Sequence, residues 1–372
     1  MAKSIIRCFG CGCELQNHDP LQTGYTPKIL DGDGTVLCQR CYRLQHYGEN
    51  KDDFIAEPDY ANIFKNINAR KNLILYALDL FNFESSIIRV VHPYIKDNPI
   101  LVVANKRDIL PKAIDDDKLK EFIYQRLKQE GIEPQGIIVT SAYKNYNFDE
   151  IFEAGRALSN KKDIYIIGAS SVGKSSIINT FLKNYKNASR NVITTSPYPG
   201  TTVATIRIPI DNYRMIIDTP GVLVKDSMQA LLEKAALKYI IPRTEVRPIT
   251  YQLSSKQSII LGGLARLDII DGPKAGYTIY ASRDLEIQRC KLEKADSTFN
   301  NLVSKKKIKP TSNTVTGVES LAGEENVYVL PVGKKVDIVI SGLGWVSVKG
   351  NGQTIVVRAP KGILTVVRDA MI

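Results

Sequence analysis

The chain has 372 residues, of which 44% are hydrophobic and 24% are charged, and it carries a formal net charge of +11. This composition excludes a wholly disordered protein, because disordered chains have too few apolar residues to form a core. At roughly 100–200 residues per domain, the length indicates two or three domains. No apolar run approaches the ~18 residues that cross a bilayer and no signal peptide precedes the cysteines, so we expect a cytoplasmic protein with no membrane partner. The positive excess favours a nucleic acid partner.

Three regions differ in composition along the chain. Five of the six cysteines lie in the first 41 residues, which predicts a cysteine module over residues 1–48. Short β-branched runs then alternate with charged, helix-like segments, as in a doubly wound α/β sheet, and predict a domain over residues 49–224. Residues 225–372 predict a helix at 227–240 followed by a β-rich domain, and residues 241–372 hold 19 basic and 12 acidic side chains. The expected strands are 73–80, 99–104, 136–140, 163–168, 203–210 and 213–218, and later 258–270, 276–281, 336–340, 345–348 and 354–358.

A phosphate-binding loop is predicted between a strand and a helix. Residues 168–175, GASSVGKS, fit the pattern G-x-x-x-x-G-K-S directly after the strand-like run 163–168. Gly168 and Gly173 let the backbone wrap closely, so that successive N–H groups and the helix N-terminus surround the phosphates. Lys174 would reach the β- and γ-phosphates, and Ser175 would supply a hydroxyl to Mg²⁺. The remaining nucleotide-binding residues assigned to this loop are Ser171, Val172 and Ser176.

Two further segments are predicted to respond to the γ-phosphate. The strand-like run 213–218 ends in D-T-P-G, where the Asp218 carboxylate can hold the Mg²⁺ shell and the Gly221 N–H can contact the γ-phosphate. Upstream, residues 196–202 contain P-G-T-T, a loop whose threonine could ligate the metal when a triphosphate is present. Thr202 is the first choice for this ligand and Thr201 the second. Together with Lys174, the residues Thr202, Asp218 and Gly221 form the predicted catalytic set.

Guanine specificity is predicted from N-K-R-D, residues 105–108, which follow the strand-like run 99–104. The Asp108 carboxylate can accept hydrogen bonds from the N1–H and the amino group of guanine, and adenine has no such donors in place. Asn105 would brace the loop and contact the base, while the stem of Lys106 can lie over the ring. Ser141 and Ala142, after the run 136–140, would add a backbone N–H to the guanine carbonyl oxygen. GTP and GDP are therefore the expected ligands, and an ATP-using P-loop protein is the alternative.

The order of these motifs is unusual, because the guanine-reading segments precede the phosphate loop, whereas in ordinary small GTPases they follow it. A sheet tolerates such a rearrangement when the original termini lie near each other. The order NKRD, SA, GASSVGKS, PGTT, DTPG resembles the circularly permuted GTPases. The N-terminal C-F-G-C and C-Q-R-C make the chain similar to the YqeH-type members over essentially its whole length.

The resemblance implies an α/β fold in which a P-loop GTPase domain with circularly permuted motif order is flanked by an N-terminal zinc finger and a β-rich C-terminal domain. It further implies action in biogenesis of the small ribosomal subunit, with the subunit precursor and rRNA as partners. The C-terminal domain would be similar to an RNA-binding attenuation protein and would dock on rRNA. We expect a monomer. The alternative is a GTP-gated RNA-binding scaffold in which hydrolysis is incidental.

Two residues bear on the rate of hydrolysis. Val222 follows D-T-P-G, where many signalling GTPases carry the glutamine that orients the attacking water. An aliphatic side chain cannot do this, so we expect slow intrinsic hydrolysis that a partner or a monovalent cation would stimulate. Relatives that use K⁺ often carry asparagine at the fourth position of the phosphate loop, and this chain has Ser171 there. A hydroxyl can ligate K⁺ less strongly than an amide oxygen, so K⁺ stays an open candidate.

Two C-x-x-C pairs predict a structural Zn²⁺ site. Each pair can place two thiolates on one side of a tight turn, and four thiolates leave no open coordination position. The expected ligands are Cys8, Cys11, Cys38 and Cys41, with Cys13 as an alternative ligand. In the C-terminal region, the run 304–310, SKKKIKP, either contacts RNA phosphates or forms a solvated loop.

Overall fold

The computed structural model describes residues 15–19, 25–27, 38–39, 67, 70–185, 206–209, 214–219, 221–222, 224–321 and 326–372, with only the backbone at 185 and 206–209. The chain forms two compact units, which we describe separately. The N-terminal unit comprises Met1–Leu80, Ser86–Arg107 and Lys120–Leu223. The C-terminal unit comprises Phe81–Ser85, Asp108–Leu119 and Val224–Ile372.

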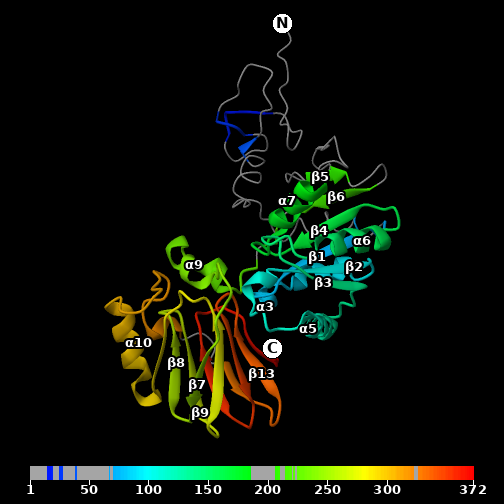
Figure 1. The fold of residues 1–372 in the computed structure, drawn as a ribbon. Helices are drawn as coiled ribbons and strands as arrows, with labels where there is room; N and C mark the ends of the chain where they lie inside the picture. The colour runs from blue at the N-terminus through cyan, green and yellow to red at the C-terminus, as the bar shows by residue number, and fades with distance from the viewer. Residues whose placement is uncertain are drawn as a thin grey trace. The chain divides into compact units, whose positions relative to one another are not determined.

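The N-terminal unit is built on a six-stranded sheet with the strand order β3-β2-β1-β4-β6-β5 (Figure 1). Neighbouring strands are parallel except for β5, which runs antiparallel to β6. Every residue of the apolar runs in β1 and β2 is buried, as a parallel sheet covered on both faces requires. The strands are β1 (Leu73–Asp79), β2 (Ile100–Asn105), β3 (Gly136–Val139), β4 (Ile164–Gly168), β5 (Ile206–Pro209) and β6 (Met215–Asp218). These bounds confirm the expected strands of the middle region, within the described residues.

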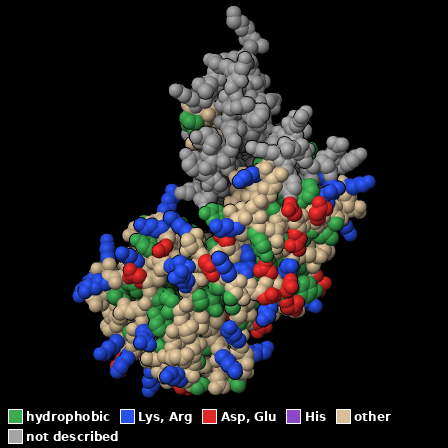
Figure 2. Space-filling model, in the orientation of Figure 1, with side chains coloured by type: hydrophobic (Ala, Val, Ile, Leu, Met, Phe, Trp, Pro, Cys, Tyr) green, Lys and Arg blue, Asp and Glu red, His purple; other side chains and the backbone are tan. Residues whose placement is uncertain are grey.

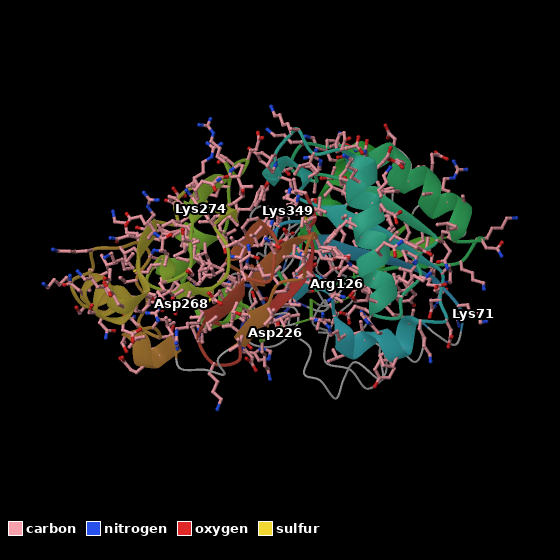
Figure 3. The ribbon with its side chains drawn as sticks, turned by 90° about the horizontal axis from the view of Figure 1, so that it is seen from below. Lys71, Arg126, Asp226, Asp268, Lys274 and Lys349 are labelled. Carbon is pink, nitrogen blue, oxygen red and sulfur yellow. The ribbon has the colours of Figure 1, made fainter. Side chains whose placement is uncertain are left out.

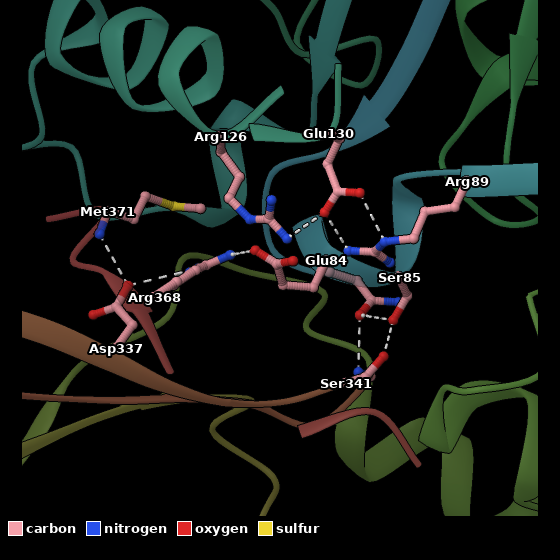
Figure 4. A network of polar contacts seen from close by, with 11 residues as sticks. Glu84, Ser85, Arg89, Arg126, Glu130, Asp337, Ser341, Arg368 and Met371 are labelled. Carbon is pink, nitrogen blue, oxygen red and sulfur yellow. Dashed lines mark hydrogen bonds and ion pairs between the residues drawn. The ribbon is translucent and has the colours of Figure 1, made fainter. Parts of the chain in front are cut away.

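Helical segments connect the strands of this sheet. They are α3 (Phe83–Ser86), η1 (Arg89–Val91), α4 (His92–Ile95), η2 (Arg107–Ile109), α5 (Asp116–Gln129), α6 (Phe148–Leu158) and α7 (Lys174–Tyr185). Directly after α5, Glu130 forms ion pairs with Arg89 and Arg126, and each guanidinium nitrogen lies 2.7 Å from Oε1 of Glu130 (Figure 4). Burial raises the pKa of the Glu130 carboxyl, but the two guanidinium groups outweigh it and hold this pKa below its usual value.

The register of the parallel strands places their carboxyl ends along one edge. Asp79 pairs with Asn105, Ala77 with Gly168, and Ile166 with Asp218. From β1 the chain continues to β2 and β3 on one side of β1, and it then crosses to β4 on the other side. The direction in which strands are added therefore reverses between β1 and β4. In open α/β sheets, ligands bind outside the carboxyl ends of the strands at such a point. The sheet thus positions the segments that the motifs had singled out.

The C-terminal unit is a sandwich of two antiparallel five-stranded sheets, ordered β16-β13-β14-β10-β7 and β11-β8-β9-β15-β12. Their inner faces form one apolar core that includes Ile259, Leu267, Tyr277, Ile338 and Val357. The strands are β7 (Ile249–Leu253), β8 (Gln257–Leu261), β9 (Ala265–Asp271), β10 (Ala275–Ala281), β11 (Ile287–Lys291), β12 (Asn326–Val329), β13 (Lys335–Ile340), β14 (Gly344–Lys349), β15 (Thr354–Arg358) and β16 (Thr365–Asp369). The helical segments are α8 (Met228–Leu231), α9 (Lys234–Ile240), η3 (Leu292–Lys294), α10 (Ala295–Ser304) and η4 (Val318–Leu321). In Figure 1, α10 lies beside β8.

Two expected elements of this unit are wrong in detail. The run 258–270 is a hairpin of β8 and β9, because Gly262, with φ +58°, and Gly263 turn the chain between them. The expected helix 227–240 is broken into α8 and α9 at Leu232 and Glu233, which are both extended. The Glu233 carboxylate accepts hydrogen bonds from the Ser312 hydroxyl at 2.9 Å and from a neighbouring backbone N–H, and this tertiary contact is not encoded in the local pattern.

Two groups of buried charges lie in the C-terminal unit. Asp268, labelled in Figure 3, is fully buried and pairs with Arg266 at 2.8 Å and Arg358 at 2.9 Å. Arg368 pairs with Glu84 at 3.0 Å and with Asp337 at 3.5 Å, and both carboxylates are fully buried (Figure 4). Burial raises the pKa of Asp337 above its usual value, although the charge of Arg368 opposes this.

Candidate nucleotide site

The loop after β4 has the geometry of a phosphate-binding loop. It connects β4 to α7 and adopts positive φ at Ser171 (+65°) and Gly173 (+94°), so backbone N–H groups can turn toward one point. A Cβ atom on Gly168 would lie 2.8 Å from the carbonyl oxygen of Ala77 and 2.9 Å from the side chain of Val172. Only glycine fits at position 168 without moving the backbone of β1.

The N-K-R-D segment is joined directly to this loop. Asn105 donates from Nδ2 to the carbonyl oxygen of Val172 at 3.0 Å, and its Oδ1 accepts the N–H of Ala142 at 3.0 Å. Lys106 has a positive φ of 68° and donates from Nζ to the carbonyl oxygen of Ser171 at 2.8 Å. Two predicted base-reading residues thus hold the phosphate loop, and Asn105 ties it to the Ser141–Ala142 segment.

Asp79 is a residue of this site that the sequence interpretation missed. It is buried at the carboxyl end of β1, and its Oδ2 lies 2.7 Å from the Nζ of Lys106. The ion pair fixes the lysine stem that was expected to lie over the base. The signal was present in the sequence, because the apolar run 73–78 ends in a carboxylate just as the run 99–104 ends in Asn105.

The D-T-P-G segment lies against the phosphate loop. Ala169 pairs with Val222 in a parallel bridge, and the Ser170 N–H donates to the Val222 carbonyl oxygen at 2.8 Å. Lys174 is buried and donates from Nζ to the carbonyl oxygen of Gly168 at 3.0 Å. A Cβ atom on Gly221 would lie 3.1 Å from the same Nζ. The predicted catalytic residues Lys174 and Gly221 are therefore neighbours, and Asp218 is buried at the end of β6.

The remaining predicted base-reading residues follow strands β2 and β3. Asp108 is half-buried in η2. The N–H of the preceding residue, Arg107, donates a hydrogen bond to the Thr140 carbonyl oxygen at 3.0 Å. Ser141 is buried and its Oγ accepts the N–H of Lys144 at 3.0 Å. Ser175 and Ser176 are half-buried in the first turn of α7. The roles of Asp108 and Ser176 in nucleotide binding stay predictions.

These residues fit a Mg²⁺–nucleotide complex. Gly168 and Gly173 form a cradle that a Cβ atom would fill, and the start of α7 offers its N–H groups to an anion. Ser175 and Asp218 carry the oxygen donors that Mg²⁺ takes, and they are the residues that would hold it. When bound, the ion neutralises charge on the β- and γ-phosphates. Lys174 would add a buried positive charge at the same phosphates.

Some predicted residues lie outside the described part of the chain. These are Thr201 and Thr202 of the P-G-T-T segment and the cysteines Cys8, Cys11, Cys13 and Cys41. Cys38 is described and is buried. Within the described ranges, no group of three or more His, Cys, Asp or Glu side chains could hold a metal ion. The zinc site accordingly stays a prediction.

Comparison with known proteins decides the family. The chain is 34% identical over 367 residues to the "Uncharacterized protein YqeH" of Bacillus subtilis, covering 99% of each chain. Residues 274–371 match the family described as "YqeH-like, C-terminal". The chain belongs to the YqeH family. Residues 163–261 of this YqeH-family chain also match the family described as "50S ribosome-binding GTPase", which agrees with the phosphate loop and the D-T-P-G segment.

More distant relatives of this YqeH-family protein occur in eukaryotes. The chain is 24% identical over 396 residues to "NO-associated protein 1, chloroplastic/mitochondrial" of Arabidopsis thaliana, covering 93% of this chain and 70% of the relative. It is 21% identical over 500 residues to "Nitric oxide-associated protein 1" of Homo sapiens, covering 94% and 72%. The likeness thus extends over most of each relative. The protein is a P-loop GTPase-family protein that binds guanine nucleotide with Mg²⁺.

Charge is distributed unevenly over the two units. Figure 2 shows Lys and Arg side chains spread over the visible face of the C-terminal unit, and Asp and Glu side chains gathered on the visible face of the N-terminal unit. Within the C-terminal unit, Lys305, Lys306 and Lys307 are exposed, while Ile308 and Pro310 are buried and anchor their loop. Across the described ranges, no helix has both the length and the apolar composition that a membrane crossing requires.

Proposed function

We propose that this protein is a slow GTPase that alternates between two nucleotide states to bind and leave a precursor of the small ribosomal subunit. The proposal rests on one observation above all. Asn105 and Lys106, which are the predicted base-reading residues, bind the carbonyl oxygens of Val172 and Ser171 in the phosphate loop. A nucleotide that contacts both segments would bind to a preorganised pair of loops, which reduces the entropy cost of binding.

The catalytic roles follow the motif positions. Lys174 would bind the β- and γ-phosphates, Ser175, Thr202 and Asp218 would hold Mg²⁺, and the Gly221 N–H would respond to the γ-phosphate. The Val222 side chain offers no group to orient water, and it is buried. Hydrolysis would therefore be slow without a partner. Ser171 is exposed and could bring K⁺ to the site, which a comparison of rates in KCl and NaCl tests.

The domain organisation is part of the proposal. A Zn²⁺ finger over residues 1–48, held by the four cysteines named above, would precede a circularly permuted GTPase domain over 49–224 and an RNA-binding domain over 225–372. In this order, the D-T-P-G segment leads directly into the C-terminal domain, so its response to the γ-phosphate would be transmitted along the chain. Metal analysis of carefully prepared protein should give about one Zn²⁺ per chain, and a lower content would refute the finger.

The partner is proposed to be rRNA in the small-subunit precursor, encountered by a monomer in the cytoplasm. Support comes from the basic C-terminal unit and from the matched family model, whose description names the ribosome. The matched "50S ribosome-binding GTPase" description concerns the large subunit, so both subunits must be tested separately. Co-sedimentation with purified small and large subunits, with GDP, with a non-hydrolysable GTP analogue and without nucleotide, tests this. We expect binding to the small subunit in one nucleotide state only.

Two comparisons delimit the proposal. GDP, and not ADP, should raise the thermal midpoint of the protein, and protection by ADP would favour the ATP-using alternative. Lys174→Ala, which weakens nucleotide binding, should be compared with a variant that binds GTP and cannot hydrolyse it. Equal rescue of ribosome maturation by wild type and the hydrolysis-deficient variant would show that the protein acts as a scaffold, with hydrolysis incidental.

A further inference from the structure

The loop over residues 141–147, which we call the Tyr143 loop, joins β3 to α6 and exposes two aromatic side chains. Tyr143 is 79% exposed and Tyr146 is 42% exposed. Among the large hydrophobic side chains exposed in the described ranges, Tyr143 has the highest exposed fraction, and these two are the aromatic ones. Two exposed rings on one short loop make it a candidate interaction site, because tyrosine is enriched at interfaces.

The Tyr143 loop is held in one conformation. The Tyr146 N–H donates to the Ser141 carbonyl oxygen at 3.1 Å, and the Lys144 N–H donates to the Ser141 hydroxyl at 3.0 Å. Further hydrogen bonds run from Asn147 Nδ2 to the Val139 carbonyl oxygen (3.0 Å), from Thr180 Oγ1 to the Ala142 carbonyl oxygen (3.2 Å) and from Asn184 Nδ2 to Asn145 Oδ1 (2.7 Å). A ring presented on such a loop loses little conformational entropy when it binds.

The chemistry around the ring fits a nucleobase better than an apolar protein surface. The Nζ of Lys144 lies 4.8 Å from the centroid of the Tyr143 ring, so a cation covers one region of the ring and leaves aromatic surface for a second contact. Lys144 and Lys183, the latter next to the Asn184 that braces the loop, are both exposed. An aromatic ring beside a lysine is an arrangement in which a base can stack on the ring and a phosphate can pair with the ammonium group.

Acidic side chains near the Tyr143 loop limit how much contacts with RNA phosphates contribute to binding. Asp149 and Glu150 are exposed in the first turn of α6, where the helix dipole favours carboxylates. They oppose a long phosphate track over this surface. Stacking on Tyr143, with a single nearby ammonium from Lys144, is therefore the main expected contribution.

We propose that the Tyr143 loop is a stacking site for an unpaired base of single-stranded RNA, carried by the N-terminal unit. The inference rests on the proposed rRNA partner and adds a contact outside the zinc finger and the C-terminal unit. Tyr143 directly follows Ala142, the residue whose N–H is held by Asn105. The RNA contact and the guanine-reading segment thus share one braced loop.

The test uses the full chain and a fluorescently labelled 12-nucleotide single-stranded RNA, with dissociation constants measured by anisotropy. Tyr143→Ala should weaken binding by about tenfold, because stacking of one base is removed. Tyr143→Phe keeps the ring and should bind like wild type. Tyr124→Ala is the matched control, since Tyr124 on α5 also has a lysine, Lys128, 5.9 Å from its ring centroid. It lies outside the loop and should leave the affinity unchanged.

Several outcomes would overturn the proposal. Tyr143→Ala within twofold of wild type, or Tyr143→Phe as weak as Tyr143→Ala, would exclude stacking. Loss of GDP binding in Tyr143→Ala would assign the ring a structural role in the guanine-reading loop. Reduced co-sedimentation with ribosomal subunits at unchanged RNA affinity would identify a protein partner instead. If wild type binds no oligonucleotide, the stacking site is excluded, and the parallel wild-type co-sedimentation shows whether the proposed function fails as well.

Discussion

Replacing Gly173 by alanine should disrupt the junction between the phosphate loop and the N-K-R-D segment. Gly173 has a φ of +94°, and an added Cβ would clash with the Nδ2 atom of Asn105. That atom donates to the Val172 carbonyl oxygen, and the same side chain accepts the Ala142 N–H, each at 3.0 Å. The side chain cannot move away from the new methyl group without weakening both hydrogen bonds.

The magnitude follows from these two effects. A non-glycine residue in the left-handed region costs about 1–2 kcal/mol. Loss of two hydrogen bonds costs about 1 kcal/mol each. We therefore expect Gly173→Ala to lower the free energy of unfolding by about 3–4 kcal/mol in a urea titration. GDP affinity, measured with a fluorescent GDP analogue, should fall at least about tenfold, because both loops that would contact the nucleotide are displaced.

Gly131→Ala is the matched control for this prediction. Gly131 follows α5 with a φ of +77°, and a Cβ there would meet no atom within 4 Å. Gly131→Ala should therefore lower the free energy of unfolding only by the cost of the left-handed backbone, about 1–2 kcal/mol, and should bind GDP like wild type. If Gly173→Ala is no less stable than Gly131→Ala and binds GDP like wild type, the assigned role of Asn105 as the link between the loops is wrong.

Three further predictions concern charges. Arg368→Met should lower the free energy of unfolding by about 3–5 kcal/mol, because it leaves two buried carboxylates without their cation. Lys291→Gln, at an exposed ion pair, should change the free energy of unfolding by less than about 0.5 kcal/mol. Similar urea unfolding curves for the two variants would contradict this prediction. Asp108→Asn should weaken GDP binding and favour the xanthosine analogue, since an amide donates where the carboxylate accepts, and unchanged GDP affinity would exclude Asp108 from base recognition. Burial raises the pKa of Asp337 above its usual 3.8, so the folded state binds this proton more tightly than the unfolded state. Relative to Asp337→Asn, the free energy of unfolding of wild type should decrease as the pH rises from 3.8 through the folded pKa, and a flat difference would refute the shift.

Local pattern predicted much of the N-terminal unit because parallel strands covered on both faces are continuous apolar runs. The runs 99–104 and 163–168 correspond to β2 (Ile100–Asn105) and β4 (Ile164–Gly168), with the chemistry-bearing residues at their carboxyl ends. The run 258–270 was wrong as one strand because Gly262 and Gly263 mark a turn inside an apolar stretch. At the break between α8 and α9, Glu233 contacts Ser312, which lies 79 residues away and therefore gives no local sequence signal.

The sequence by itself determined the positions and the order of the phosphate-loop, N-K-R-D and D-T-P-G motifs and the resemblance to the YqeH family, because these depend on residue types at fixed spacings. Only the tertiary structure decided which side chains hold the loops together. Asp79 and Lys106 are 27 residues apart, and Glu84 and Arg368 are 284 apart. It also assigned Phe81–Ser85 and Asp108–Leu119 to the C-terminal unit. Such pairings depend on strand order and burial, and a charged residue has the same local sequence signal whether it finds a partner or faces water.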